Sequence, residues 1–277
     1  MEPFEPFLAR WGLRPGGAAF ASLNARLLPV QRGAEPAMLK IATAAEEERG
    51  AATLAWWGGE GAARVLAHDG PAVLMEHAQG SGSLARMARE GQDEAATRVL
   101  CAVAARLHAA RRDPPPELVS LPELFRALGL AARAHAAQPH GHLLLRAHAA
   151  ARALLAHPQE LVVLHGDLHH GNVLDFGPSR GWLAIDPKGL WGERGFDHAC
   201  LFANPDLDDP VPPVATVPAL FRRRLDVVAE AARVDRRRLL EWVLAWCGLS
   251  AAWFLGDGDP ARIDLAVAAL AEAELDR

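Results

Sequence analysis

The ten residues HGDLHHGNVL, positions 165–174, follow directly on the apolar run Leu161–Leu164. They bring three histidines, an aspartate, an asparagine and two glycines into one short segment. Such a cluster binds a metal, transfers a proton or holds a loop in shape. A zincin-type zinc site needs His165 and His169 on one helix with a glutamate between them, and the two glycines interrupt a helix here. The segment therefore argues against zinc.

The acid and the amide of this segment support a different interpretation. Asp167 and Asn172 are separated by four residues, and Asp186 follows Asn172 by fourteen positions, at the end of the apolar run 183–185. In protein kinases one Asp acts on the acceptor hydroxyl, while an Asn and a second Asp hold Mg²⁺ on the nucleotide phosphates. The spacing predicts a β-hairpin with these three side chains at one edge.

Composition limits the classes of function. At 277 residues the chain is long enough for an enzyme of one large domain or of two lobes sharing a cleft. The net charge of -5 and the scattered arginines give no basic surface for nucleic acid. Three cysteines, odd in number and set among apolar residues, indicate buried thiols rather than disulfides or a zinc ribbon.

The N-terminus and the hydropathy pattern bear on localisation. The first residues lack the basic and apolar regions of a signal peptide. No stretch of about 18 uncharged apolar residues is seen in the chain. We therefore expect a cytoplasmic protein that does not contact a membrane, present as a monomer or a weak dimer.

Residues 20–78 are predicted to form a small sheet with one helix. The run 25–41 indicates a hairpin whose second strand carries Lys40, and helical spacing continues from Glu46 until Gly58. Two further strands flank a turn at 69–71. Later residues are mainly helical, with helices expected at 93–110, 121–137 and 141–156 and strands at 161–164, 172–175 and 181–186.

A C-terminal helix is predicted in RRRLLEWVLAWCGLSAAWFL, residues 236–255. Its apolar residues recur at helical spacing. This face is typical of a helix that packs into a core, and we interpret its tryptophans as core rather than as a ligand surface. The residues of this face are Leu239, Val243, Trp246, Ser250 and Trp253.

The segment HGDLHHGNVL, followed by AIDPKGLWGERGFD, resembles the small-molecule phosphotransferases of the protein-kinase-like superfamily, which have His-Gly-Asp where protein kinases have His-Arg-Asp. The runs IDPKGLWGE and WWGGEGAARVL are similar to the aminoglycoside and hydroxyurea resistance kinases, the streptomycin 6-phosphotransferase group. The resemblance implies an α+β, two-lobed fold. Residues 1–78 would form a small β-rich nucleotide-binding lobe, and 79–277 a mainly helical lobe with the catalytic loop and the acceptor site.

The resemblance also implies roles for the residues of the two hairpin strands. Asp167 would be the catalytic base or the carboxylate that orients the acceptor. Asn172 and Asp186 would be the Mg²⁺ ligands, with ATP as the phosphate donor. Asp197 would brace the catalytic loop by accepting its backbone N–H groups.

On the N-terminal side, the resemblance implies that Lys40 grips the nucleotide phosphates. A glutamate of the next helix should pair with it, and both Glu47 and Glu48 are candidates. The backbone of residues 75–78, including Glu76 and Ala78, would contact adenine. The hairpin before Lys40 contains no G-x-G-x-x-G, so the loop that covers the phosphates is not assigned.

The acceptor implied by the resemblance is a small cationic molecule, first of all an aminoglycoside such as streptomycin. Acidic residues would have to line its site, and we expect Glu193 and Asp257 or Asp259 to do so. A sugar, choline or homoserine kinase uses the same scaffold. A non-catalytic kinase-like binding module is a further alternative, but it would predict loss of the catalytic residues, and these are present.

Overall fold

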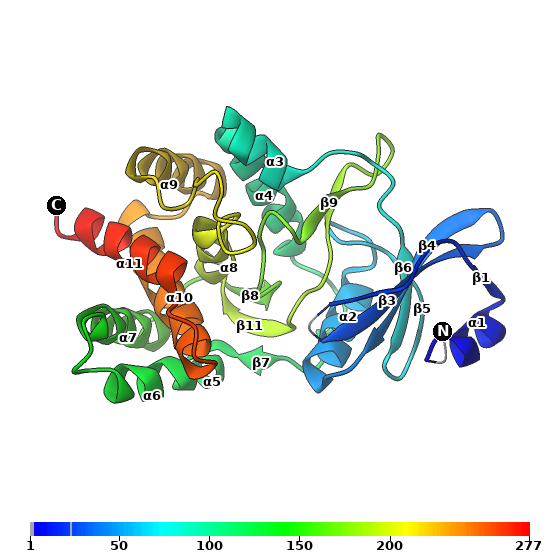
Figure 1. Ribbon diagram of the computed structural model, residues 1–277, viewed down its shortest axis with the longest axis horizontal. Helices are drawn as coiled ribbons and strands as arrows, with labels where there is room; N and C mark the ends of the chain where they lie inside the picture. Colours follow the sequence, from blue (N-terminus) through cyan, green and yellow to red (C-terminus); the bar gives the residue numbers. More distant parts are fainter. Residues whose placement is uncertain (1–2, 23) are drawn as a thin grey trace.

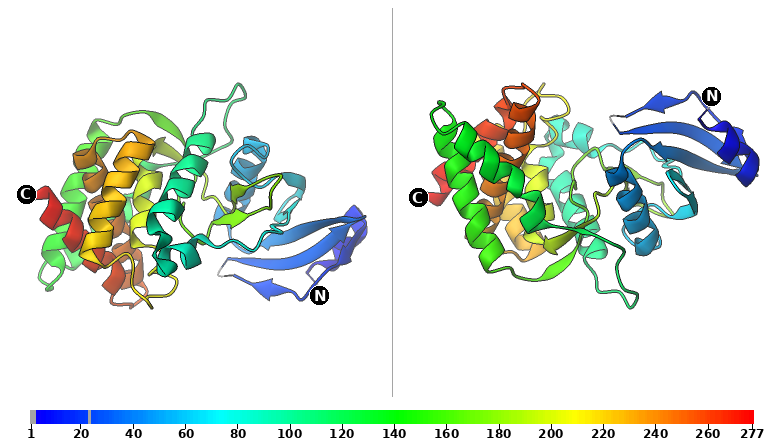
Figure 2. Two further views of the ribbon diagram at one scale, coloured as in Figure 1. Left: turned by 90° about the horizontal axis from the view of Figure 1, so that it is seen from above. Right: turned by 90° about the horizontal axis from the view of Figure 1, so that it is seen from below.

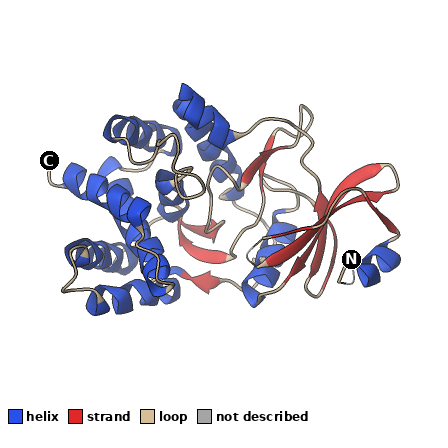
Figure 3. Ribbon diagram, in the orientation of Figure 1, coloured by secondary structure: helices blue, strands red, loops and turns tan. Residues whose placement is uncertain are grey.

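A sheet-containing lobe and a helical lobe lie side by side along the long axis of the molecule (Figure 1; Figure 3). The computed structural model describes residues 3–22 and 24–277. Met1, Glu2 and Leu23 lie outside the described residues. Met1 and Glu2 belong to the N-terminal segment from which the localisation was predicted. The first helix, α1, and the last, α11, lie at opposite ends of the molecule (Figure 1).

The N-terminal lobe is a six-stranded sheet in the order β1-β3-β4-β6-β5, with β2 paired to β3. The predicted hairpin, helix and second strand pair are all confirmed. The helix ends where Gly58 adopts a left-handed conformation, with φ 61°. The elements are α1 (Glu5–Trp11), β1 (Leu13–Pro15), β2 (Phe20–Ala21), β3 (Ala25–Arg32), β4 (Glu35–Ala42), α2 (Ala45–Trp57), β5 (Val65–Asp69) and β6 (Ala72–Glu76).

The connection between the lobes runs from the end of β6 at Glu76 to α3 (Leu84–Met87), and the expected boundary at residue 78 falls within it. It is held against β9 (Val173–Asp175), because the N–H of Gly80 donates to the Asp175 carbonyl oxygen at 2.9 Å. A Cβ atom on Gly80 would lie 1.9 Å from the Asp175 carboxyl carbon. Only glycine permits this approach of the connection to the catalytic hairpin.

The C-terminal lobe is mainly helical, and Figure 2 shows its helices gathered on the side away from the sheet. The helix expected at 121–137 is two helices that meet at Phe125. The helices are η1 (a π-helix, Ala88–Gln92), α4 (Asp93–Leu107), α5 (Leu121–Leu124), α6 (Arg126–Ala134), α7 (Gly141–Ala156), α8 (Gly195–Cys200), η2 (a 3₁₀ helix, Leu201–Ala203), α9 (Pro218–Ala232), α10 (Arg236–Gly256) and α11 (Arg262–Leu275).

Short strands between the helices carry the catalytic segment. β9 pairs antiparallel with β10 (Trp182–Ala184), which confirms the predicted hairpin. β8 (Leu161–Leu164) belongs to a different sheet, where it pairs with β11 (Leu190–Glu193), and β11 pairs in turn with β7 (Val119–Ser120). β7 and β11 were not predicted from the sequence.

Helix α10 lies at the centre of the helical lobe and packs against α6, α7, α8, α9 and α11. It is long and apolar enough to cross a membrane by length and composition, and 67% of its most apolar window is buried within the fold. This is the behaviour of a core helix. The predicted core face is buried from Leu239 to Ser250, but the prediction is wrong for Trp253, which is 44% exposed.

Asp264 in the first turn of α11 gives a prediction about stability. It is fully buried, and the Ser250 hydroxyl and its own backbone N–H offset only part of the cost of burying its charge. Burial raises the pKa of Asp264 from 3.8 to about 7. A carboxyl group whose pKa is raised by folding stabilises the protein most at low pH, and this stability is lost as the pH rises from the unfolded pKa through the folded one.

Asp264→Asn is therefore expected to raise the free energy of unfolding at pH 8 by on the order of a few kcal/mol. The gain should shrink steadily as the pH falls toward 4. Urea unfolding of both proteins at several pH values measures it, with Asp226→Asn on the exposed face of α9 as the control. A gain that does not depend on pH would contradict the assignment.

Candidate active site

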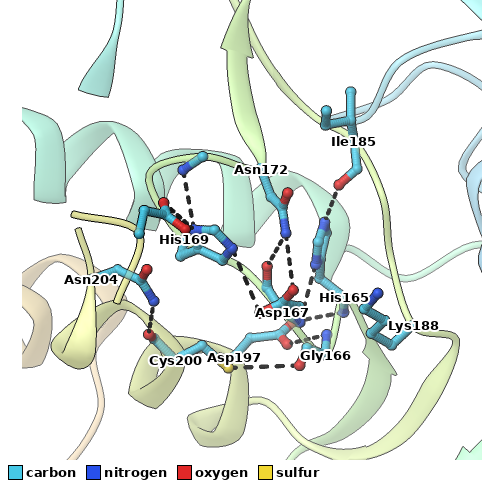
Figure 4. Close-up of polar contacts among 12 residues, drawn as sticks. His165, Gly166, Asp167, His169, Asn172, Ile185, Lys188, Asp197, Cys200 and Asn204 are labelled. Carbon is cyan, nitrogen blue, oxygen red and sulfur yellow. Dashed lines mark hydrogen bonds and ion pairs between the residues drawn. The ribbon is translucent and has the colours of Figure 1, made fainter. Parts of the chain in front are cut away.

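The loop between β8 and β9 takes its shape from Asp197 in α8. The Asp197 carboxylate accepts the N–H groups of His165 at 2.9 Å and Gly166 at 2.8 Å (Figure 4), and it lies 2.8 Å from the ring Nε2 of His108. Gly166 has φ 87°, in the left-handed region that favours glycine. The prediction that Asp197 braces the loop is confirmed.

His165 ties the loop to the end of β10. Its Nε2 lies 2.8 Å from the Ile185 carbonyl oxygen, and its Nδ1 accepts the N–H of Asp167 at 3.2 Å (Figure 4). Complete burial lowers the pKa of His165, so the ring is neutral, and Nε2 carries the proton that it donates. Both ring nitrogens are engaged, which leaves no lone pair for zinc.

Asp167 and Asn172 meet at the centre of the loop. The Asn172 side-chain amide donates to the Asp167 carbonyl oxygen at 2.9 Å and to its carboxylate at 3.2 Å (Figure 4). Burial opposes the charge on Asp167, but the nearby His169, with Nε2 3.7 Å from Oδ1, holds the pKa of Asp167 at about 2. The carboxylate is therefore ionised, and its side chain is 34% exposed toward the cleft.

Asp186 follows the hairpin strand β10 and has a left-handed backbone, with φ 62°. The N–H of Ile185 donates to the Asn172 carbonyl oxygen at 2.9 Å, which places Asp186 beside Asn172. Because Asn172 donates through its amide nitrogen, its side-chain oxygen stays available. An amide oxygen and a carboxylate are hard ligands of the kind that Mg²⁺ prefers, so the residues present fit this ion.

Lys40 on β4 donates to the carboxylates of Glu47 and Asp186, and so connects the two lobes. Glu47 is buried and Glu48 is exposed, which decides between the two candidates in favour of Glu47. Helix α2 comes very close to the catalytic hairpin at Gly50, where a Cβ atom would lie 2.1 Å from the Pro187 carbonyl oxygen. Only glycine allows this helix position.

Lys188 is a charged group of the site that was not predicted from the sequence, although it stands two positions after Asp186. Its Nζ lies 3.3 Å from a carboxylate oxygen of Glu47 and 3.4 Å from one of Glu46. Burial opposes its charge, but the carboxylates of Asp186 and Glu47 raise the pKa of Lys188. The site therefore holds a second permanent cation beside Lys40.

Glu76 and Ala78, both expected to contact adenine, differ in how many of their polar groups are already hydrogen-bonded within the protein. The Glu76 side chain pairs with Arg180 at 2.7 Å and accepts the N–H of Arg64 at 2.7 Å, and the Glu76 N–H donates to the Arg64 carbonyl oxygen at 3.0 Å. The side chain and the N–H of Glu76 are thus engaged within the protein, and contact of the backbone of residues 75–78 with adenine stays a prediction. For the N–H of Ala78, the described residues provide no hydrogen-bond partner, so it can serve a ligand.

The expectation that Glu193 lines an acceptor site is wrong. Its side chain is buried at 4% exposure and accepts hydrogen bonds from Arg238 at 2.6 and 2.5 Å and from the Trp242 ring N–H at 2.7 Å. The backbone N–H of Gln159 donates to it as well, at 2.8 Å. Both oxygens are thus used in holding β11 to α10, and Glu193 is a structural residue.

A cavity of about 980 Å³ opens beside the catalytic loop. Its walls come from the start of α2, the catalytic loop, the segment 204–208 and the C-terminal part of α10. Ser22, after β2, and Asn24, before β3, reach it from the N-terminal lobe. Asp257 also lines this cavity, whereas Asp259 accepts the N–H of Ala261 at 2.8 Å and lies outside it.

Among the described residues, the cleft contains no pair of nucleophile and base that would form a covalent intermediate. It instead brings an ionised carboxylate next to a pair of magnesium-type ligands and a buried lysine, with the two lobes on either side. Positioning and charge neutralisation of this kind are what phosphoryl transfer requires. The fold and the cleft define a phosphotransferase of the protein-kinase-like class.

The family model of the aminoglycoside/hydroxyurea antibiotic resistance kinases matches residues 10–258, and the chain belongs to this family. It is 52% identical to a streptomycin 3''-kinase of Klebsiella pneumoniae, over 97% of this chain and 100% of the relative. It is 36% identical to a streptomycin 6-kinase of Streptomyces glaucescens, over 95% and 87% of the two chains. The fold is similar to that of an aminoglycoside phosphotransferase of Streptomyces rimosus in complex with ADP and streptomycin, with a TM-score of 0.57, 20% identity and coverage of 90% and 99%.

The pairing of Lys40 with Glu47 rather than Glu48 can be tested with two matched variants. Glu47→Gln should lower kcat/KM for ATP roughly 10- to 100-fold, because a charge-assisted hydrogen bond contributes about 1.5–3 kcal/mol. Glu48→Gln makes the same chemical change on the exposed face of the same helix and should have no effect. Equal losses in the two variants would contradict the assignment.

Proposed function

We propose that this protein transfers the γ-phosphate of ATP to the 3''-hydroxyl of streptomycin. The observation that carries phosphoryl transfer is the convergence of Asp167, Asn172 and Asp186 at the edge of one hairpin beside the large cavity. The choice of hydroxyl is supported by the higher identity to the streptomycin 3''-kinase than to the streptomycin 6-kinase.

In this proposal the N-terminal lobe and the hairpin hold the nucleotide. Lys40 binds the α- and β-phosphates, the free N–H of Ala78 contacts adenine, and the turn with Ser22 and Asn24 covers the phosphates. Asn172 and Asp186 would hold Mg²⁺, which when bound neutralises charge on the phosphates.

Asp167 acts on the acceptor. Its ionised carboxylate accepts a hydrogen bond from the streptomycin hydroxyl, points the oxygen at the γ-phosphate and takes up the proton as the new bond forms. Asn172 fixes the position of this carboxylate through its amide hydrogen bond. Asp208 and Asp257 in the cavity wall give a negative surface that suits a polycationic acceptor. We further propose that the protein works in the cytoplasm, where ATP is available, as a monomer or a weak dimer.

The proposed function is tested by the structure of the product. Purified protein, ATP and Mg²⁺ are incubated with streptomycin, and ³¹P–¹H correlation NMR identifies the carbon that bears the phosphate. Phosphate at position 3'' supports the proposal. Phosphate at position 6 would contradict the choice of hydroxyl, and an unmodified antibiotic would contradict the acceptor.

Asp167→Asn should reduce kcat by on the order of 10²–10⁴, because the amide cannot take the proton and presents a donor to the hydroxyl. The affinity for ATP should stay nearly unchanged, since Asp167 acts on the acceptor. Steady-state kinetics together with calorimetric titration of a non-hydrolysable nucleotide separate the two quantities. Turnover close to that of the unaltered enzyme would mean that the loop has another role.

Asn172→Ala and Asp186→Ala should behave differently from Asp167→Asn. Each removes an oxygen ligand, so the Mg²⁺ concentration for half-maximal rate should rise about tenfold or more, equivalent to at least ~1.4 kcal/mol. Added Mg²⁺ should restore part of the rate in Asn172→Ala and none in Asp167→Asn. Stoichiometric zinc in protein purified without added metal would argue against this donor set.

A further inference from the structure

The C-terminal part of α10 changes its surroundings within two turns. Trp246 and Ser250 are buried at 5% and 4% exposure, whereas Trp253, on the same helical face, is 44% exposed. All three line the cavity beside Asp167, and so does the partly exposed Phe254. Because the helix rises about 1.5 Å per residue, this aromatic strip extends roughly 10 Å from Trp246 to Trp253.

Packing of α10 into the core does not explain why a tryptophan stands at position 253, because the Trp253 side chain is 44% exposed. Every other tryptophan of this helix is buried in the core, and exposing a large aromatic side chain forfeits the favourable burial that those residues gain. Exposure by itself is ordinary for a single residue. Trp253 is distinguished by its place on the wall of the cavity that also contains the catalytic carboxylate.

Acidic residues accompany the aromatic strip. Asp257 is four residues beyond Trp253, so it lies on the same face of the chain as α10 ends, and it lines the same cavity. Asp208 lines the cavity from the segment 204–208, and its carboxylate lies 3.9 Å from the ring of His169. An exposed indole with carboxylates in the same cavity suits a cation that has a flat or apolar face.

We propose that Trp253 is a specificity-determining platform on which a guanidinium group of the acceptor stacks, with Asp257 as its counter-charge. This inference rests on the proposed function, because streptomycin carries two guanidinium groups on its streptidine ring. A guanidinium is planar and weakly hydrated, so it gains from an aromatic face more than a compact ammonium does. The platform selects guanidinium-bearing acceptors from other cationic alcohols.

The test compares four variants by steady-state kinetics with streptomycin and with ATP. Trp253→Ala should raise the KM for streptomycin about tenfold, while the KM for ATP and kcat stay within about twofold. Trp253→Phe keeps an aromatic face and should recover most of the affinity. Trp191→Ala is the matched control, because Trp191 is 39% exposed on β11 and lies outside the cavity lining.

A thermal unfolding curve for each variant guards against a folding defect. The fourth variant, Trp253→Leu, keeps apolar bulk without the π-face. If Trp253→Leu and Trp253→Ala both retain the streptomycin KM within twofold, the platform is wrong. It is also wrong if Trp191→Ala raises that KM equally. Failure of the unaltered enzyme to phosphorylate streptomycin removes the proposed function itself, which is a different result from an active enzyme that is indifferent to Trp253.

Discussion

The backbone leaves β8 through the left-handed glycine Gly166, and the N–H groups of His165 and Gly166 point at a buried carboxylate. A buried N–H without a partner costs about 1–3 kcal/mol, and a buried carboxylate without donors costs more. The Asp197 carboxylate accepts both N–H groups and so avoids both costs. The ring Nε2 of His108 is its third hydrogen-bond partner. The position of Asp167, one residue further on, depends on this arrangement, and Asn172 depends in turn on Asp167.

The charges in the cleft form a second set of mutual constraints. Glu47 contacts both Lys40 and Lys188, and Asp186 contacts Lys40. Glu47 therefore has two cationic partners, and Lys188 would still pair with this buried carboxylate if Lys40 bound phosphates as proposed. Breaking a buried pair is costly because an uncompensated charge remains. The second lysine thus lowers the cost of separating Lys40 from Glu47.

The sequence predicts those parts of the site that are local in the chain. Spacing alone brings Asp167, Asn172 and Asp186 to one hairpin, and glycines mark the ends of elements such as α2. Spacing does not choose between Glu47 and Glu48, because the choice depends on the rotation of α2 about its axis. That rotation places Gly50 against the Pro187 carbonyl oxygen, and Pro187 is far away in the chain.

Glu193 is a second case in which distant partners decide the role of a residue. In the sequence it is an acid near the catalytic segment, and nothing local shows that Arg238 and the ring of Trp242 converge on it. Strand β11, to which Glu193 belongs, is equally hidden, since its four residues LWGE contain a glycine and lack an alternating pattern. Glu193 takes these partners from α10, and strand β11 takes its partners from β8 and β7, both distant in the chain.

Helix α10 shows why an acceptor site is harder to predict than a catalytic loop. Period 3.6 places Trp246, Ser250 and Trp253 on one face, but it carries no information about where the packed core ends along that face. The end is set by neighbouring segments, because α8 packs on the helix at Trp242 and α7 packs on it at Gly248, whereas Trp253 borders the cavity. Catalytic residues must keep a fixed local spacing, whereas an acceptor surface has only to border an open space. The acceptor side of such an enzyme can therefore change through single exposed residues while the catalytic hairpin stays the same.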